Sequence, residues 1–199
     1  MAFRVMRLAP SGLPVRWIDW QEAAILAVRN QILWSLGDEP LTVRGGINRR
    51  GQQSVLEISP MIACQGHHGS SPGVPALTNP ILFRRDRQRC LYCGEVHSVS
   101  LLTRDHVLPK VQGGSDCWTN VVTACRRCNQ HKGGRTPEQA GMPLLAVPFR
   151  PNIFEFMYLA NRNIRGDQMA YLSQRFGDHL KDPARGRISG PAPEYSAPG

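Results

Sequence analysis

One stretch decides how this chain folds: residues 90–133, which read CLYCGEVHSVSLLTRDHVLPKVQGGSDCWTNVVTACRRCNQHKG. A CxxC pair opens the stretch at Cys90 and Cys93, and a second pair follows at Cys125 and Cys128. The 31 residues between the pairs allow the chain to close as a loop around one tetrahedral zinc ion held by four thiolates. The alternative is two unrelated cysteine pairs, one of them redox-active.

The same segment has few large apolar residues, so it needs a source of stability other than a core. A structural zinc ion contributes on the order of 10 kcal/mol or more of folding free energy. The remaining cysteines, Cys64 and Cys117, stand alone, and the chain carries no secretion signal. This cysteine usage favours metal binding over disulfides, and we expect about one zinc ion per chain.

The residues between the cysteine pairs predict a ββα unit. Residues 100–109 indicate a strand that ends in the polar pair Asp105-His106, and residues 110–119 indicate a glycine-containing loop. Residues 121–124 form a second short strand pattern, and residues 126–132 a helix. We therefore expect an α+β fold in which zinc joins the base of this helix to the strand that opens the unit.

The polar residues of this unit suit the hydrolysis of a phosphodiester bond. That reaction needs a base for the attacking water and positive charge at the phosphate. His106 offers an imidazole, and Asp105 and Asn129 offer the oxygen ligands that a divalent ion prefers. Adjacent residues of a strand point to opposite sides, so Asp105 and His106 can share a site only at a strand end or twist. We place them at the rim of the hairpin.

From Arg84 to Met142 the chain resembles the HNH endonucleases, or ββα-metal nucleases, in the segments CLYCG, RDHVLPKVQGG and TNVVTACRRCNQHKGGRTPEQAGM. The resemblance implies that His106 is the general base. It implies that Asp105 and Asn129 hold a catalytic ion such as Mg²⁺, Mn²⁺ or Ni²⁺, and that Asn120 braces the loop. The four cysteines resemble the zinc-stabilised branch of the family. Asn129 replaces the histidine that ends the family's name, which bears on metal preference.

The chain is basic, with a formal net charge of +9 and a pI near 9.8. Residues 84–135 hold ten Lys or Arg and four Asp or Glu, so +6 of that charge lies in the candidate nuclease segment. Such a bias favours a polyanionic partner. His131 is more typical of an exposed helix residue than of a metal ligand. The candidate phosphate contacts, taken as a group against a solvated basic face, are Lys110, Arg126, Arg127, Lys132 and Arg135.

The rest of the chain divides by composition. We expect an N-terminal α/β unit, a linker rich in glycine and proline, the nuclease module, a C-terminal helical segment and a disordered tail, at residues 1–65, 66–82, 83–145, 146–177 and 178–199. Within the first unit the patterns predict strands at 5–8, 32–36, 41–44 and 54–58 and a helix at 20–30. Two C-terminal helices begin near Asn152 and Asp167 and pack on the first unit.

No run of about 18 apolar residues or signal-peptide core is present, so we expect a cytoplasmic protein that does not enter the membrane. The expected activity is metal-dependent cleavage of DNA, with the protein bound mainly through the phosphate backbone. Two alternatives stay open: a non-catalytic zinc-containing module that binds nucleic acid, and an adaptor recruited by a protein partner. A double-strand cut would suggest a homodimer or two sequential nicks.

Overall fold

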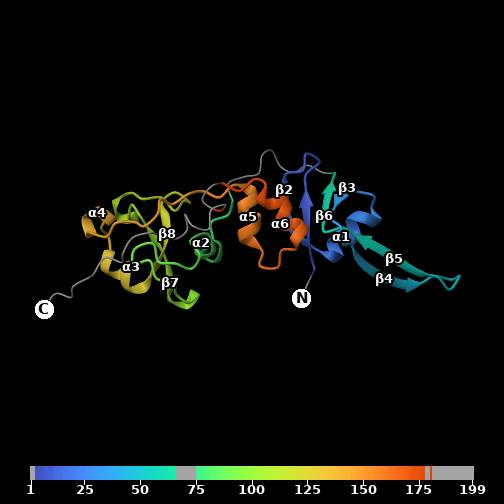
Figure 1. The fold of residues 1–199 in the computed structure, drawn as a ribbon, viewed down its shortest axis with the longest axis horizontal. Helices are drawn as coiled ribbons and strands as arrows, with labels where there is room; N and C mark the ends of the chain where they lie inside the picture. Colours follow the sequence, from blue (N-terminus) through green and yellow to red (C-terminus); the bar gives the residue numbers. More distant parts are fainter. Residues whose placement is uncertain (1–2, 66–74, 178–179, 181–199) are drawn as a thin grey trace. The chain divides into compact units, whose positions relative to one another are not determined.

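A computed structural model of the chain describes residues 3–65, 75–177 and 180 (Figure 1). The chain divides into two compact units, one made of residues 1–75 and 152–177 and the other of residues 76–151 with the segment from 178 onward. The fold is α+β, as the sequence predicts. Most of the expected linker, including His67 and His68, and nearly all of the expected tail lie outside the described residues.

The first unit is built on a four-stranded sheet in the order β2-β1-β6-β3. β1 pairs with β6 in parallel, and the other two pairs are antiparallel. β4 and β5 form a separate antiparallel hairpin. The elements of this unit are β1 Arg4–Leu8, β2 Pro14–Asp19, α1 Trp20–Val28, β3 Ile32–Leu36, β4 Leu41–Ile47, β5 Gln53–Ile58, β6 Met61–Cys64, α5 Ile153–Ala160 and α6 Gly166–Ser173.

Helix α1 begins where the sequence predicts, because the Asp19 side chain accepts a hydrogen bond from the Glu22 amide at 2.8 Å. The Glu22 carboxylate forms an ion pair with Arg16. Ala23 and Leu26 on the inner side of the helix are buried against the sheet and the β4–β5 hairpin, in one apolar cluster with Val5, Ile18, Ile58, Ile62 and Cys64. Strands β2 and β6 lie where the sequence patterns indicate no strand.

Helices α5 and α6 pack on this first unit. The indole of Trp17 on β2 donates to the Met157 carbonyl of α5 at 2.9 Å, and the buried amide of Gln168 on α6 donates to the Pro60 carbonyl at 2.9 Å. Asn152 and Glu155 form a complete capping box at the start of α5. The two C-terminal helices thus cover strands that lie more than a hundred residues earlier in the sequence.

The second unit contains the ββα arrangement. β7 and β8 pair antiparallel, with Leu102 opposite Cys125 and His106 opposite Val121, and α3 follows β8 without a loop. The elements are α2 Asn79–Arg85, the 3₁₀ turns η1 Val99–Leu101 and η2 Lys110–Gln112, β7 Leu102–His106, β8 Val121–Cys125, α3 Arg126–Lys132 and α4 Pro137–Ala140.

The expected linker boundary at residue 82 is wrong, because α2 already begins at Asn79 with a proline in its first turn. Leu82 and Phe83 are buried in an apolar cluster with Leu102, Trp118 and Val121. The preceding run of Gly and Pro conceals the helix in the sequence. Residues 146–151 also belong to this unit, where the buried Arg85 donates to the Phe149 carbonyl at 2.9 Å.

Among the described residues, no helix combines the length and the apolar character that crossing a membrane requires.

Candidate functional site

The four cysteines of the two CxxC pairs come together. The sulfurs of Cys90, Cys93, Cys125 and Cys128 all lie within 4.8 Å of one another. Four thiolates around one zinc ion, with Zn–S bonds of about 2.3 Å, lie about 3.8 Å apart, so the cluster needs little adjustment. None of the four is in a disulfide. The arrangement fits one tetrahedral ion and joins β8 and α3 to the turn at residues 90–94.

The turn and the helix start shape this cluster. Gly94 has a left-handed φ of +78°, which a residue with a Cβ adopts only at a cost, and its amide donates to the Cys90 carbonyl at 2.9 Å. Cys125 caps α3, since its sulfur accepts from the Cys128 amide at 3.4 Å. Each cysteine pair is therefore held by its own backbone before a metal binds.

Without a metal, two thiols of this cluster, Cys93 and Cys128, hold their protons more tightly than a free cysteine does. Burial, aided by the neighbouring thiol of Cys90, raises the pKa of Cys93 to about 11. Burial and the nearby Cys90 also raise the pKa of Cys128. A zinc ion must replace these protons to bind the thiolates, so binding releases protons and weakens as the solution is acidified.

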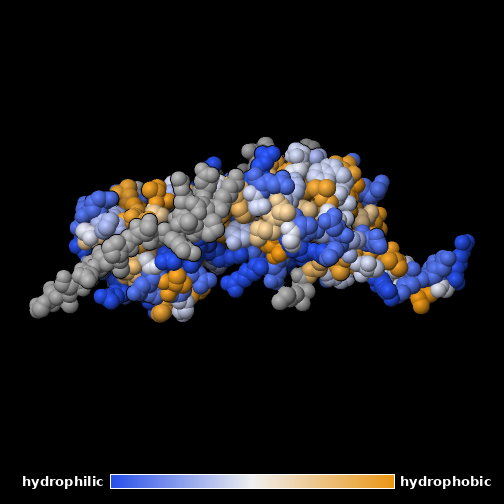
Figure 2. Space-filling model, in the orientation of Figure 1, coloured by the Kyte–Doolittle hydropathy of each residue, from blue (hydrophilic) through white to orange (hydrophobic). Residues whose placement is uncertain are grey.

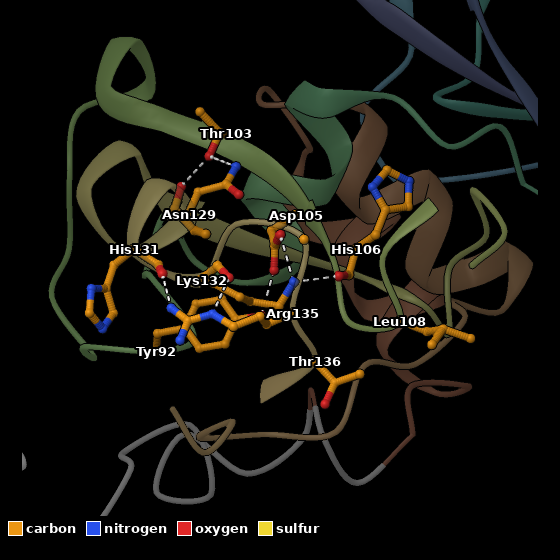
Figure 3. Close-up of polar contacts among 12 residues, drawn as sticks. Tyr92, Thr103, Asp105, His106, Leu108, Asn129, His131, Lys132, Arg135 and Thr136 are labelled. Atoms are coloured by element: carbon orange, nitrogen blue, oxygen red, sulfur yellow. Dashed lines mark hydrogen bonds and ion pairs between the residues drawn. The ribbon is translucent and has the colours of Figure 1, made fainter. Parts of the chain in front are cut away.

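Asp105 lies at the centre of a buried polar network (Figure 3). Its Oδ1 accepts from the Lys132 ammonium at 3.1 Å, and its Oδ2 accepts from the Tyr92 hydroxyl at 2.5 Å. Burial and the charge of Asp105 raise the pKa of Tyr92, so the phenol stays protonated and donates. Lys132 also donates to the His106 carbonyl at 2.8 Å. The only full positive charge bonded to this carboxylate among the described residues is the ammonium.

His106 ends β7 and points away from the Asp105 carboxylate (Figure 3). Its Nε2 lies 2.8 Å from Oδ1 of Asp116, whose other oxygen accepts from Arg104 at 2.7 Å. Partial burial raises the pKa of the Asp116 carboxyl, but the bonds from Arg104 and His106 outweigh it and leave that pKa below its ordinary value. Asp116 is therefore ionised near neutral pH, and its carboxylate accepts a hydrogen bond from Nε2 of His106.

Arg104 is itself held by α2 and the segment before it. Its Nε donates to the Asn79 side chain at 2.8 Å, and its NH2 donates to the Leu77 carbonyl at 3.3 Å. The Arg104 side chain is only 18% exposed. These contacts of Arg104 hold Asp116 beside the imidazole of His106 and fix the His106–Asp116 pair at the rim of the hairpin.

Asn129 lies on the face of β7 that also carries Asp105. Its Nδ2 donates to the Thr103 hydroxyl at 2.9 Å, while Lys132, one turn further along α3, bonds Asp105. No hydrogen bond or ion pair among the described residues joins any two of Asp105, His106 and Asn129. Strand alternation gives the reason: Thr103 and Asp105 face α3, and His106 faces the loop that carries Asp116.

Asn120 holds the loop between the two strands. Its side chain accepts from the Leu108 amide at 2.9 Å and donates to the carbonyls of Leu108 and Ser115 at 3.1 and 2.8 Å. Gly114 leaves room for this crossing, since a Cβ built on it would lie 1.7 Å from the Leu108 carbonyl oxygen. The loop thus keeps the Asp116 carboxylate opposite His106.

One of the five basic residues expected to contact phosphate is not on the surface. Lys132, grouped above with the phosphate contacts, is fully buried, so its ammonium is not a surface charge. It stays in the site because the carboxylate and the carbonyl replace the water that a buried ammonium loses. The other members of the group are exposed: Lys110, Arg126, Arg127 and Arg135.

Sequence reasoning missed Tyr92, Arg104 and Asp116 as members of this site. Their residue types carry no metal or catalytic signature by themselves. The only signal for Asp116 is its place two residues after Gly113-Gly114 in the loop that returns towards His106, and Tyr92 is hidden between two cysteines.

A comparison with protein-family models gives a match to the HNH endonuclease family over residues 90–145. The matched segment begins at the first zinc-site cysteine and includes β7, β8, α3 and α4. Residues 90–145 form an HNH-type domain. It coincides with the ββα arrangement and its cysteine cluster, as expected from the resemblance.

A curated relative shares this domain. The CRISPR-associated endonuclease Cas9 of Corynebacterium diphtheriae is 39% identical over 51 residues. The aligned region is 25% of this chain and 5% of the relative, so the likeness concerns the HNH-type domain.

Proposed function

We propose that this protein is a metal-dependent DNA endonuclease that hydrolyses phosphodiester bonds at its HNH-type domain. The observation that carries the proposal is the family match over residues 90–145, the segment that holds His106 beside an ionised carboxylate. The net charge of +9 supports DNA as the substrate, because the phosphate backbone attracts a basic protein regardless of sequence.

His106 is the general base in this proposal. Its Nε2 is bonded to Asp116 at 2.8 Å, and a carboxylate there stabilises the tautomer with the proton on Nε2. The Nδ1 lone pair is then available to accept a proton from the attacking water. Asp116 also stabilises the imidazolium that forms. It acts through His106 and is a positioning residue.

Asp105 on β7 and Asn129 on α3 are the proposed ligands of the catalytic ion. Both offer hard oxygen donors, on the side of β7 that faces α3. A bound divalent ion supplies positive charge for the phosphate and for the departing 3′ oxygen. The donor types fit such an ion, but both Asp105 oxygens already accept hydrogen bonds, from Lys132 and Tyr92. Binding at Asp105 therefore requires exchange or sharing of the Lys132 contact.

Two further parts complete the proposal. Zinc at the four cysteines holds α3 against the hairpin, so that Asn129 and Lys132 stay opposite β7. The exposed basic residues contact the DNA backbone as a group, and removing any one of them should weaken binding only modestly.

The experiment that tests the proposal is cleavage of supercoiled plasmid by the zinc-loaded protein with Mg²⁺, Mn²⁺, Ni²⁺ or no added divalent ion. We expect nicking that needs a divalent ion and that His106→Ala abolishes. His131→Ala is the matched control, because His131 is an exposed histidine of α3 and should leave the rate unchanged.

Equal nicking by wild type and His106→Ala would contradict the proposal. DNA binding without cleavage, under every ion, would instead favour the non-catalytic zinc module.

A further inference from the structure

The outer half of the β4–β5 hairpin is a ribbon with both faces in water. Every residue from Arg44 to Val55 is exposed, whereas the inner half packs Leu41, Val43, Leu56 and Ile58 on the core of its unit. In Figure 1 the hairpin extends away from the sheet of the first unit, and Figure 2 shows its end as strongly hydrophilic. An isolated two-stranded hairpin is marginally stable, so an exposed ribbon of this length needs an explanation beyond folding.

The ribbon is positively charged. Arg44, Arg49 and Arg50 lie in its exposed half, and the hairpin's single acidic residue is Glu57, near its base. None of the three arginines is in an ion pair with another described residue. Their charge therefore has no intramolecular partner there and is available to an anionic one.

The tip is held in one conformation. Oδ1 of Asn48 accepts from the amides of Arg50 and Gln52 at 2.9 and 3.0 Å, and the Asn48 amide donates to the Gln52 carbonyl at 2.8 Å. Gly51 takes the left-handed φ of +75° that closes the turn. The tip is thus preorganised, which lowers the entropy lost when the two arginine side chains bind a ligand.

The remaining side chains suit a groove of DNA. A two-stranded ribbon fits the major groove, which is about 12 Å wide and about 8.5 Å deep. Beyond their hydrogen bonds with the Asn48 side chain and the Gly45 carbonyl, Gln52 and Gln53 retain amide donors for base edges. Ile47 and Val55 are 72% and 58% exposed, and apolar side chains contact the thymine methyl in this groove.

We propose that the exposed half of the β4–β5 hairpin, residues 44–55, inserts into a groove of double-stranded DNA, with Arg49 and Arg50 on the phosphates or base edges. This inference rests on the proposed function for the choice of DNA as the anion. It assigns to the first unit a contact with the duplex that adds to the backbone contacts proposed for the HNH-type domain.

The test is DNA binding by the full-length, zinc-loaded protein without added Mg²⁺, Mn²⁺ or Ni²⁺, where no cleavage is expected. The probe is a labelled 20-base-pair duplex, and anisotropy gives the Kd at several salt concentrations. Arg49→Ala/Arg50→Ala should weaken binding about 10-fold at low salt. If both side chains neutralise phosphates, the slope of log K against log salt should fall by about 1.8.

The matched control is Arg29→Ala/Arg162→Ala, which removes the same charge from exposed positions elsewhere in the first unit. It should change the Kd less than twofold. An equal loss in both double variants would overturn the proposal, because long-range charge alone would explain it. No loss in the hairpin variant would overturn it as well, and so would a loss seen with duplex RNA and absent with duplex DNA.

The outcome is separable from that of the proposed nuclease function. His106→Ala should bind the duplex as tightly as wild type, and the hairpin variant should cleave at the wild-type rate once DNA is saturating. If wild type cleaves no DNA yet binds it through the hairpin, the nuclease proposal fails alone. If cleavage depends on His106 but binding ignores the hairpin, the hairpin proposal fails alone.

Discussion

At the scale of single residues, two carboxylates of the HNH-type domain have separate environments. Asp116 is 42% exposed at its side chain and bonds His106 and Arg104, whereas Asp105 is buried with Lys132 and Tyr92. The first environment keeps a carboxylate ionised next to an imidazole. The second pairs a buried carboxylate with the ammonium of Lys132. Each environment predicts a different response to substitution.

Asp116→Asn should lower the DNA cleavage rate by about 10- to 100-fold, because an amide no longer favours the Nε2 proton or stabilises the imidazolium. DNA affinity measured without an added catalytic ion should stay within about twofold. The ¹⁵N chemical shifts of His106 would report the change of tautomer directly. Unaltered ¹⁵N shifts together with a wild-type rate would show that Asp116 does not position His106 for catalysis.

Lys132→Met should destabilise the protein by about 3 kcal/mol, because it leaves a buried carboxylate without its countercharge. The same change frees Asp105 for a divalent ion. Mn²⁺ should then raise the Tm of the variant more than that of wild type, and the double variant with Asp105→Asn should lose this extra response. Identical Mn²⁺ shifts in all three proteins would show that Asp105 does not take the ion.

At the scale of elements, the cluster of four cysteines connects the parts of the ββα unit. Cys125 ends β8 and caps α3, and Cys128 lies in the first turn of that helix. Asn129 and Lys132 follow within the same helix, so the position of α3 sets theirs. α3 has seven residues, too few to be stable alone in water. Its place depends on packing and on the metal.

Acidification should speed removal of zinc by a chelator. The pKa of Cys93 is raised to about 11 in the metal-free protein, so protons hold the thiol at pH 6 to 8 and compete with zinc across this range. Zinc affinity should therefore rise with pH and fall as pH is lowered, which a colorimetric zinc release assay would measure. Release rates independent of pH would argue against thiolate ligation.

The sequence predicted those elements whose signal lies in a short run of residues or in the spacing of a motif. The helix at 126–132 and the strand that ends at His106 follow from the sequence, as does the cysteine cluster. β6 and α2 were missed because their residues read as loop or linker: β6 is a short apolar run, and α2 follows a stretch rich in Gly and Pro. The Lys132–Asp105 pair spans 27 residues, and no local pattern reports such a tertiary contact.

At the scale of the whole molecule, the two units have separate cores. The apolar cluster around Val5 and Ile18 belongs to the first, and the clusters around Cys90 and Leu82 belong to the second. The four cysteines of the candidate zinc site all lie in the second unit. The sequence predicted an N-terminal α/β unit and C-terminal helices. It did not predict the exposed basic ribbon, because the strand patterns of the hairpin do not show that its outer half extends into water.

Calorimetry of the full-length protein should resolve this division. Removal of zinc should lower or abolish one unfolding transition, by a loss of several kcal/mol in that unit, and leave the other within a few degrees. Circular dichroism should retain the signal of the first unit. A single transition that moves as a whole with zinc would show that the two units unfold together.

The claim on which the account depends is that His106 removes a proton from the attacking water. Its most direct measurement is single-turnover DNA cleavage by His106→Ala with and without added imidazole, at a fixed concentration of divalent ion. We expect the substitution to lower the rate by about 10²- to 10⁴-fold and imidazole to restore part of it, with no rescue of Asp116→Asn. Cleavage by His106→Ala at the wild-type rate would contradict the account.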